Sequence, residues 1–293
     1  MSVVRASLFR LATSTRLERA VRATAQGERL ARRAADRYVA GLSVADAWQV
    51  AAGLHQRGVG ASVDQFGELV ADAATADRVA DDYQQLAAAL PDQPEGVWLS
   101  VDLSHLGLDI APRRCAEHLT GIAAAVPAGR RIQVGAEDYH RADAVLGCVL
   151  AAAETGLADR LGATVQANLH RSAADLDRLV GAGVHIRLVK GAYVEPHSRA
   201  LPYGEPTDIA YVRLAHRLAA AGGECALATH DGVVREALLT ALGPVAVEQL
   251  LGVRPEVLDD LVTRRVPVRV YVPFGGDWFR YWMRRVAESR GTA

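Results

Sequence analysis

The feature that most constrains the fold is an alternation of short apolar, β-branched runs with segments of helix length. Glycine or proline stands before most of these runs, and such residues commonly punctuate secondary structure. Short strands that alternate with helical segments are typical of βαβ units and of a parallel sheet. Eight runs of this kind occur, at residues 57–62, 97–103, 131–134, 163–166, 184–189, 224–228, 245–247 and 268–272.

Eight βα units in a chain of 293 residues favour a closed (β/α)8 barrel of the TIM type, an α/β fold, over an open sheet. The segment before the first run is rich in Ala and Arg, with apolar residues recurring at three and four, and predicts helices. No stretch has the composition of a linker. The sequence therefore predicts one domain over residues 1–293, with an N-terminal helical extension at 1–55 and the barrel with a final helix at 56–293.

Bulk composition excludes several classes of protein. A formal net charge of −1 argues against nucleic-acid binding, which normally requires a basic surface. Cys115, Cys148 and Cys225 are widely spaced without a CxxC pattern, which argues for a reducing compartment and against a structural zinc site. No apolar run approaches the roughly 18 residues of a membrane span. A cytoplasmic protein is expected, whose arginine-bearing N-terminal helix either packs on the domain or touches a membrane surface.

In α/β barrels, reactive groups gather at the carboxyl ends of the strands. The fifth run leads into Arg187, Lys190 and Gly191, and Lys190 is the only lysine in the chain. Strict alternation puts Arg187 and Lys190 on opposite faces, so both reach one ligand only if the chain leaves strand geometry near the glycine. Two cations there suit an electron-rich or anionic cofactor, and structural ion pairs are the alternative.

Polar side chains also end the fourth and sixth runs. These are Gln166 and the pair Thr229 and His230, the latter followed by Asp231. No second His or Cys stands near His230 at ligand spacing, which argues against a metal. His230 is therefore either a structural residue or part of an organic-ligand site.

A C-terminal helix is expected at 278–289. On it, Tyr281, Arg284, Arg285 and Glu288 share one face, because they lie at i, i+3, i+4 and i+7. Two adjacent guanidinium groups beside a tyrosine form a fork suited to a carboxylate. A solvated basic face with an Arg284–Glu288 pair explains the same spacing.

Taken together, these segments resemble the proline dehydrogenase family. The motifs that carry the resemblance are Gln166-Ala167, RLVKGAY at 187–193, ATH at 228–230, and YVPFG at 271–275 with YWMRRVAE at 281–288. They occur in the family's order, over roughly residues 57–288. The closing segment is the most specific of them.

The resemblance implies a barrel that holds FAD at the strand ends and transfers a hydride from a ring carbon beside a secondary amine, such as proline, to give a cyclic imine. It implies catalytic roles for Arg187, Lys190 and Tyr281. The expected flavin contacts are Ala136, Gln166, Arg187, Val189, Lys190, Gly191, Thr229 and His230. The expected substrate contacts are Asp102, Tyr193, Leu250, Tyr271, Tyr281, Arg284, Arg285 and Glu288. It also suggests a quinone or other electron acceptor, and hence a transient contact of a cytoplasmic protein with the inner membrane.

Two departures from the family's pattern concern the substrate. Asp102 stands where the family usually has a lysine that helps to hold the carboxylate, and Gly135 where it usually has an aspartate. Asp231 replaces a usual Asn, and Ala246 a usual Glu. Loss of a lysine–carboxylate contact costs about 1.5–3 kcal/mol of binding. We therefore expect weak turnover of proline, or a preference for a substituted or basic proline analogue.

Two other functional classes remain open on the sequence. Asp102 and Gly135 are compatible with a relative that keeps the flavin but has lost turnover and acts through a partner protein. Lys190 at a strand end is also compatible with a Schiff-base aldolase.

Overall fold

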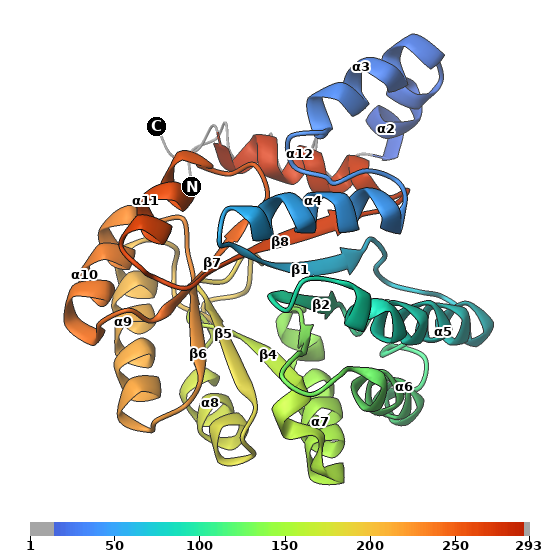
Figure 1. Ribbon diagram of the computed structural model, residues 1–293. Helices are drawn as coiled ribbons and strands as arrows, with labels where there is room; N and C mark the ends of the chain where they lie inside the picture. The colour runs from blue at the N-terminus through green and yellow to red at the C-terminus, as the bar shows by residue number, and fades with distance from the viewer. Residues whose placement is uncertain (1–14, 290–293) are drawn as a thin grey trace.

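The computed structural model describes residues 15–289, with side chains from Glu18 to Val286. Eight parallel strands close into a barrel in the order of the chain, β8 pairing with β1. The predicted (β/α)8 class is thereby confirmed, and Figure 1 shows the helices surrounding the strands. The strands are β1 (Gly60–Gln65), β2 (Val97–Val101), β3 (Ile132–Val134), β4 (Leu161–Gln166), β5 (His185–Val189), β6 (Cys225–Ala228), β7 (Ala246–Leu250) and β8 (Val268–Phe274).

A helix follows each of the strands β1 to β8, and three helices precede the barrel from residue 15 onward. Among the described residues the α-helices are α2 (Thr15–Arg22), α3 (Ala25–Ala35), α4 (Val44–Gln56), α5 (Ala73–Ala89), α6 (Pro112–Ala125), α7 (Ala142–Ala152), α8 (Ser172–Gly181), α9 (Glu205–Ala220), α10 (Gly232–Leu242), α11 (Glu256–Thr263) and α12 (Trp278–Ser289). Short 3-10 helices are η1 (Leu90–Asp92), η2 (Tyr139–Arg141) and η4 (Ala158–Arg160), and a π-helical turn, η3 (Ala153–Leu157), extends α7.

All eight expected strands exist, with shifted ends. The first begins at Gly60 rather than at 57, because Arg57 caps α4 and Gly58 turns the chain with a φ of +73°. The second ends at Val101, after which the backbone turns and the amide of His105 donates to the carbonyl of Asp102. The seventh continues to Leu250 through the polar residues Glu248 and Gln249, both of which are buried.

The apolar core lies between the strands and the surrounding helices. Alternate strand residues such as Val63, Leu99, Ile186 and Leu188 are fully buried and pack in one large cluster with the inner faces of the helices. Burial of this apolar surface is the main favourable term in folding.

The barrel interior is polar, which is unusual, since bulky branched residues dominate most such interiors. Arg187 on β5 contacts Glu248 on β7 and Ser62 on β1, strands that are not neighbours, so the contacts cross the inside of the barrel. Nearer the amino ends of the strands, the Arg269 guanidinium stacks 3.4 Å from the centre of the Trp98 ring, which meets His185 edge-on.

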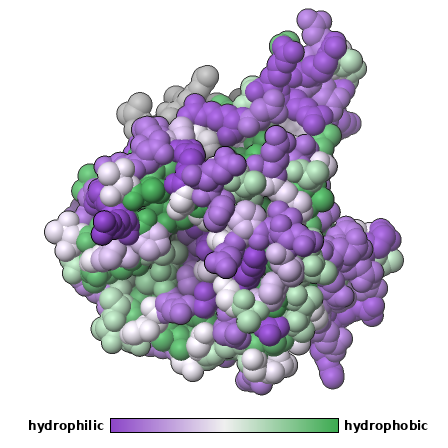
Figure 2. Space-filling view, viewed as in Figure 1, coloured by the Kyte–Doolittle hydropathy of each residue, from purple (hydrophilic) through white to green (hydrophobic). Residues whose placement is uncertain are grey.

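The N-terminal helices α2 and α3 form an arm that projects beside α12 (Figure 1). Ala35, Tyr38 and Val39 pack with Trp278 and Phe279 in a second apolar cluster. The visible side of the arm is largely hydrophilic (Figure 2). The division at residue 55 stays a prediction; α4, which ends at Gln56, packs in the main core. Within residues 15–289, no helix is long and apolar enough to cross a membrane.

Candidate active site

The carboxyl ends of β4, β5 and β6 bring a ring of polar groups to the barrel mouth. Gln166 ends β4 and donates from Nε2 to the carbonyl of Glu137 at 2.8 Å. Thr229 accepts at Oγ1 from the amide of Asp231, whose carboxylate caps α10. His230 accepts at Nε2 from the amide of Leu250 at 3.3 Å. Burial, together with nearby arginines of which Arg285 is the first, lowers the pKa of His230 to about 4, so the ring is neutral at pH 7.

Lys190 lies just beyond β5, and its ammonium group is held between two carboxylates. Nζ lies 2.5 Å from Oδ1 of Asp208 at the start of α9 and 2.6 Å from Oδ2 of Asp231. Burial alone would lower the pKa of Lys190, but the two carboxylates outweigh it and raise the pKa above its ordinary value. A Schiff-base lysine requires the opposite shift. The charged state of Lys190 therefore disfavours the aldolase alternative.

Gly191 gives the chain the turn that the sequence requires there. Its φ is +108°, a conformation that other residues rarely adopt, and a Cβ at this position would lie 2.0 Å from Oδ1 of Asn168. That oxygen is buried without a hydrogen-bond partner among the described residues. Regular strand geometry ends at Val189, so Arg187 points into the barrel whereas Lys190 turns toward α9 and α10. The structure thus separates the two cations, which share no partner among the described residues.

Arg187 lies in the barrel interior, below the mouth. It is 8% exposed, and its Nε donates to Oε2 of Glu248 at 2.5 Å. Glu248 is 4% exposed. Arg187 therefore forms the structural ion pair that was the alternative to a ligand contact. On β5 it is the inward-facing residue that precedes Val189 by two positions.

Helix α12 lies over the same mouth. The charge of Arg284 partly opposes the raised pKa values of Asp102 and Tyr193, and the charge of Arg285 contributes to the lowered pKa of His230, so both guanidinium groups lie near the strand ends. Arg284 also lies 3.7 Å from the carboxylate of Glu68. Glu288 belongs to α12, but its side chain lies outside the described residues, so the predicted Arg284–Glu288 pair is untested.

Asp102 and Gly135, the two departures at the substrate end, occupy one place in space. A Cβ on Gly135 would lie 1.8 Å from Oδ1 of Asp102, so the Asp102 carboxylate fills the position of a side chain at 135. Burial raises the pKa of Asp102 well above its ordinary value, as do the charges of Asp64 and Glu137. The two changes therefore amount to one carboxylate supplied from β2 in place of one supplied from β3, together with the loss of the lysine.

Aromatic side chains wall the other side of the mouth. The Tyr281 ring lies 5.1 Å from that of Phe66 and 6.1 Å from that of Tyr271. Tyr271 donates to Oδ2 of Asp64 at 3.0 Å, and Tyr193 donates to the carbonyl of Ala136 at 3.0 Å. Of the expected substrate contacts, Asp102, Tyr193, Leu250, Tyr271, Tyr281, Arg284 and Arg285 are thus gathered around the mouth.

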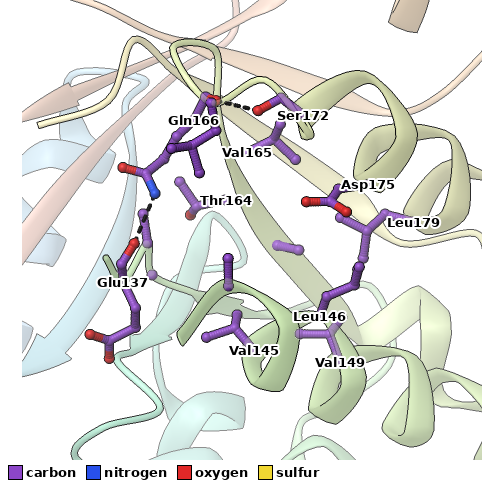
Figure 3. Close-up of a pocket in the computed structure, with 15 residues that line it drawn as sticks. Glu137, Val145, Leu146, Val149, Thr164, Val165, Gln166, Ser172, Asp175 and Leu179 are labelled. Atoms are coloured by element: carbon purple, nitrogen blue, oxygen red, sulfur yellow. Dashed lines mark hydrogen bonds between the residues drawn. The ribbon is translucent and has the colours of Figure 1, made fainter. Parts of the chain in front are cut away.

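A small cavity lies behind the mouth, between β4 and helices α7 and α8 (Figure 3). Val145, Leu146 and Val149 line one side and Leu179 another, while Gln166 closes it toward the strand ends. Its volume of about 50 Å³ leaves room for a few water molecules but not for a tricyclic ring.

Comparison with known proteins bears on this constellation. The family model described as proline dehydrogenase matches residues 47–293. The chain belongs to the proline dehydrogenase family. Proline dehydrogenase 1 of Bacillus subtilis is 31% identical over 280 residues, which cover 92% of this chain and 91% of that protein. Proline dehydrogenase of Deinococcus radiodurans is 33% identical over 301 residues, which cover 98% and 96%.

Solved structures share the fold. The proline utilization A (PutA) of Bdellovibrio bacteriovorus, in a crystal structure of the protein inactivated by N-propargylglycine, matches with a TM-score of 0.81 at 17% identity. A mutant of PutA from Bradyrhizobium japonicum matches with a TM-score of 0.73 at 24% identity. The first match covers 98% of this chain but 36% of the PutA chain, so the present chain spans about a third of these larger proteins. Members of the proline dehydrogenase family are oxidoreductases and generally flavoproteins, which confirms the predicted family and enzyme class.

Three residues of the mouth and interior were not predicted from the sequence. Asp64 receives hydrogen bonds from Tyr271 and Tyr83 at 3.0 and 2.9 Å, Asp208 holds Lys190, and Glu248 holds Arg187. Each partner is distant in sequence. The alternation of side chains along each strand was the signal that could have found them, because it determines which residues face the barrel interior once the register is known.

Proposed function

We propose that this protein oxidises proline or a closely related cyclic secondary amine, with FAD as its cofactor and a quinone as the electron acceptor. The observation that carries the proposal is that α12 lies at the same barrel mouth as the polar ring of β4 to β6: its Tyr281 ring is 6.1 Å from that of Tyr271 on β8, and Arg285 lies 5.0 Å from the Tyr281 ring. Arg284 lies 3.7 Å from Glu68, which follows β1. A carboxylate and an adjacent redox ring would then meet in one place.

The residues at the mouth fit a flavin. The turn at Gly191 brings the backbone close to the Asn168 amide, whose buried Oδ1 has no hydrogen-bond partner among the described residues and would accept one from a bound group. Gln166, Lys190, Thr229 and His230 would hold polar atoms of FAD, with Ala136, Val189 and Gly191 lining the approach and Arg187 beneath. When bound, FAD supplies the hydride acceptor that amino-acid side chains lack.

The substrate would lie between the flavin site and α12. Arg284 and Arg285 would bind its carboxylate, because paired guanidinium groups match carboxylate geometry. Tyr193, Leu250, Tyr271 and Tyr281 would wall its ring and exclude water from the carbon that loses the hydride. Asp102 would face the same end of the substrate, where it offers a carboxylate no positive charge.

The test is the visible spectrum of the protein loaded with FAD, recorded without oxygen before and after addition of proline or other cyclic amines. We expect the flavin band to bleach. Arg284→Ala should raise the substrate concentration required by about 10-fold or more, whereas Arg280→Ala, an exposed position on the same helix, should not. Flavin binding with no bleaching by any amine would instead support the inactive relative.

The substrate itself is addressed by restoring the family's usual pair. We expect Asp102→Lys with Gly135→Asp to lower the KM for proline, by up to the roughly 10- to 100-fold that one charged contact provides. Gly135→Asp alone should destabilise the protein, because its Cβ would overlap Asp102. Strong proline turnover by the unmodified protein, unimproved by the double change, would contradict the altered preference.

We further propose that the N-terminal arm brings the protein to an anionic membrane surface, where a quinone is available. Arg29, Arg32 and Arg33 of α3 are exposed, and cationic side chains favour anionic lipid headgroups by about 1 kcal/mol each. Co-sedimentation with vesicles of phosphatidylglycerol, but not with neutral vesicles, should be lost on replacing these arginines by Gln. Equal binding by both proteins would contradict this contact.

A further inference from the structure

Glu248 is a buried carboxylate that neither the motifs nor the proposed chemistry uses. It lies on β7 and receives the Nε hydrogen bond of Arg187, and its second oxygen, Oε1, is buried without a hydrogen-bond partner among the described residues. A carboxylate in such a place costs several kcal/mol of desolvation unless a cation compensates it. Its position therefore requires a specific reason.

The contact depends on small residues of the strand between the two partners. β6 lies between β5 and β7, and Arg187 pairs in register with Ala226, which pairs with Ala246. Methyl groups at these positions leave the interior open, so the guanidinium can pass across β6 and reach Glu248. Two residues further along β7 than Ala246, Glu248 lies roughly 6.6 Å nearer the carboxyl end of the strand, at the rise of parallel strands.

Glu248 balances more than one buried cation. It pairs in register with Arg269, whose pKa burial lowers to about 9 while the charge of Glu248 raises it. Arg187 and Arg269 also repel each other within the barrel. The interior beneath the mouth would carry two uncompensated positive charges without this carboxylate.

We propose that Glu248 is a positioning residue that fixes Arg187 beneath the flavin and cancels part of its charge, and thereby sets the reduction potential of the bound cofactor. The inference rests on the proposed function, in which FAD occupies the mouth above Arg187. Reduced flavin carries added negative charge, which a nearby cation stabilises. A carboxylate 2.5 Å from that cation opposes the effect and keeps the bound flavin a stronger reductant.

The experiment compares the FAD-loaded protein with its Glu248→Gln variant by measuring the midpoint potential and the affinity of the flavin for sulfite. The amide keeps the shape and the acceptor but removes the charge. We expect reduced flavin to be favoured about tenfold more strongly, which corresponds to a shift of about +30 mV for a two-electron couple, and sulfite to bind about tenfold more tightly. Glu117→Gln, the same change at an exposed position on α6, should alter neither quantity.

Glu248→Asp provides an independent arm, because it shortens the side chain while retaining the charge. It should leave the potential near that of the unmodified protein, whether or not Glu248→Gln folds. An unchanged potential in folded, flavin-loaded Glu248→Gln, or a positive shift in Glu248→Asp, would overturn the role of Glu248. Failure of the unmodified protein to bind FAD is a different result, which would overturn the proposed function and this inference with it.

Discussion

At the scale of single residues, carboxyl groups buried in the barrel determine how its stability depends on pH. Asp64 is 4% exposed and lies between the hydroxyl groups of Tyr83 and Tyr271. Burial raises its pKa from 3.8 to about 7, and the hydrogen bonds only partly oppose the shift. The native carboxyl group therefore keeps its proton over a pH range in which the unfolded chain has lost it.

Asp64 consequently makes stability depend on pH. Below pH 3.8 the group is protonated in both states and carries no penalty; as the pH rises toward 7 the unfolded state is progressively favoured, and above 7 the full cost applies. The difference between the two pKa values corresponds to an upper limit of about 4 kcal/mol. Asp64→Asn should therefore raise the melting temperature more at pH 8 than at pH 4.5.

The matched control is Asp81→Asn on the exposed face of α5. Thermal unfolding followed by circular dichroism at both pH values measures the difference. Equal effects of Asp64→Asn at the two pH values would show that Asp64 is ionised in the folded protein.

At the scale of elements, helix α12 both packs against the N-terminal arm and carries residues of the mouth. One face packs against the N-terminal arm through Trp278 and Phe279, and the other presents Tyr281 and the arginine pair to the mouth. Because a helix is a stiff body, its packing face sets where its guanidinium groups lie. The arm therefore supports the helix that carries the substrate end of the site.

Phe279→Ala tests this coupling. Phe279 is 1% exposed, and such truncations cost about 3–5 kcal/mol. We expect the free energy of unfolding to fall by that amount and the KM for the amine to rise, with little change in FAD affinity. Arg280→Ala should have a small effect on stability; an unaltered KM in Phe279→Ala would show that α12 is positioned by the barrel alone.

The elements were predictable from the sequence, whereas much of the site was not. Period and punctuation revealed eight strands and the limits of α12, since both signals are local. The partner of Arg187 could not be predicted from local signals, because the side chain is buried against Glu248, 61 residues away. Lys190 likewise meets Asp208 on a helix whose face the sequence alone did not orient. Motif resemblance located these residues at the mouth, but register and packing decided what each contacts.

At the scale of the whole molecule, binding of the cofactor should appear as stability. A ligand that binds only the folded chain stabilises it by about 2.7 kcal/mol at a concentration of 100 times its Kd. For a chain of this size that amounts to a rise of about 5 °C in the melting temperature. We expect removal of FAD to lower the melting temperature and FAD, but not ATP, to restore it. An equal rise with ATP would show that the adenine nucleotide, and not the flavin ring, is recognised.

The polar interior of the barrel has a consequence for how such proteins diverge. The apolar core between the strands and the surrounding helices stabilises the fold. The inward-facing side chains are therefore constrained more by the balance of their charges than by their shape. During divergence, an acidic residue can then be replaced by one at another position of the same strand or of the adjacent strand, provided that a cation still lies near it. Glu248, two residues after Ala246, and Asp102, which fills the place of a side chain at Gly135, are two positions of this chain where the interior accommodates such a change.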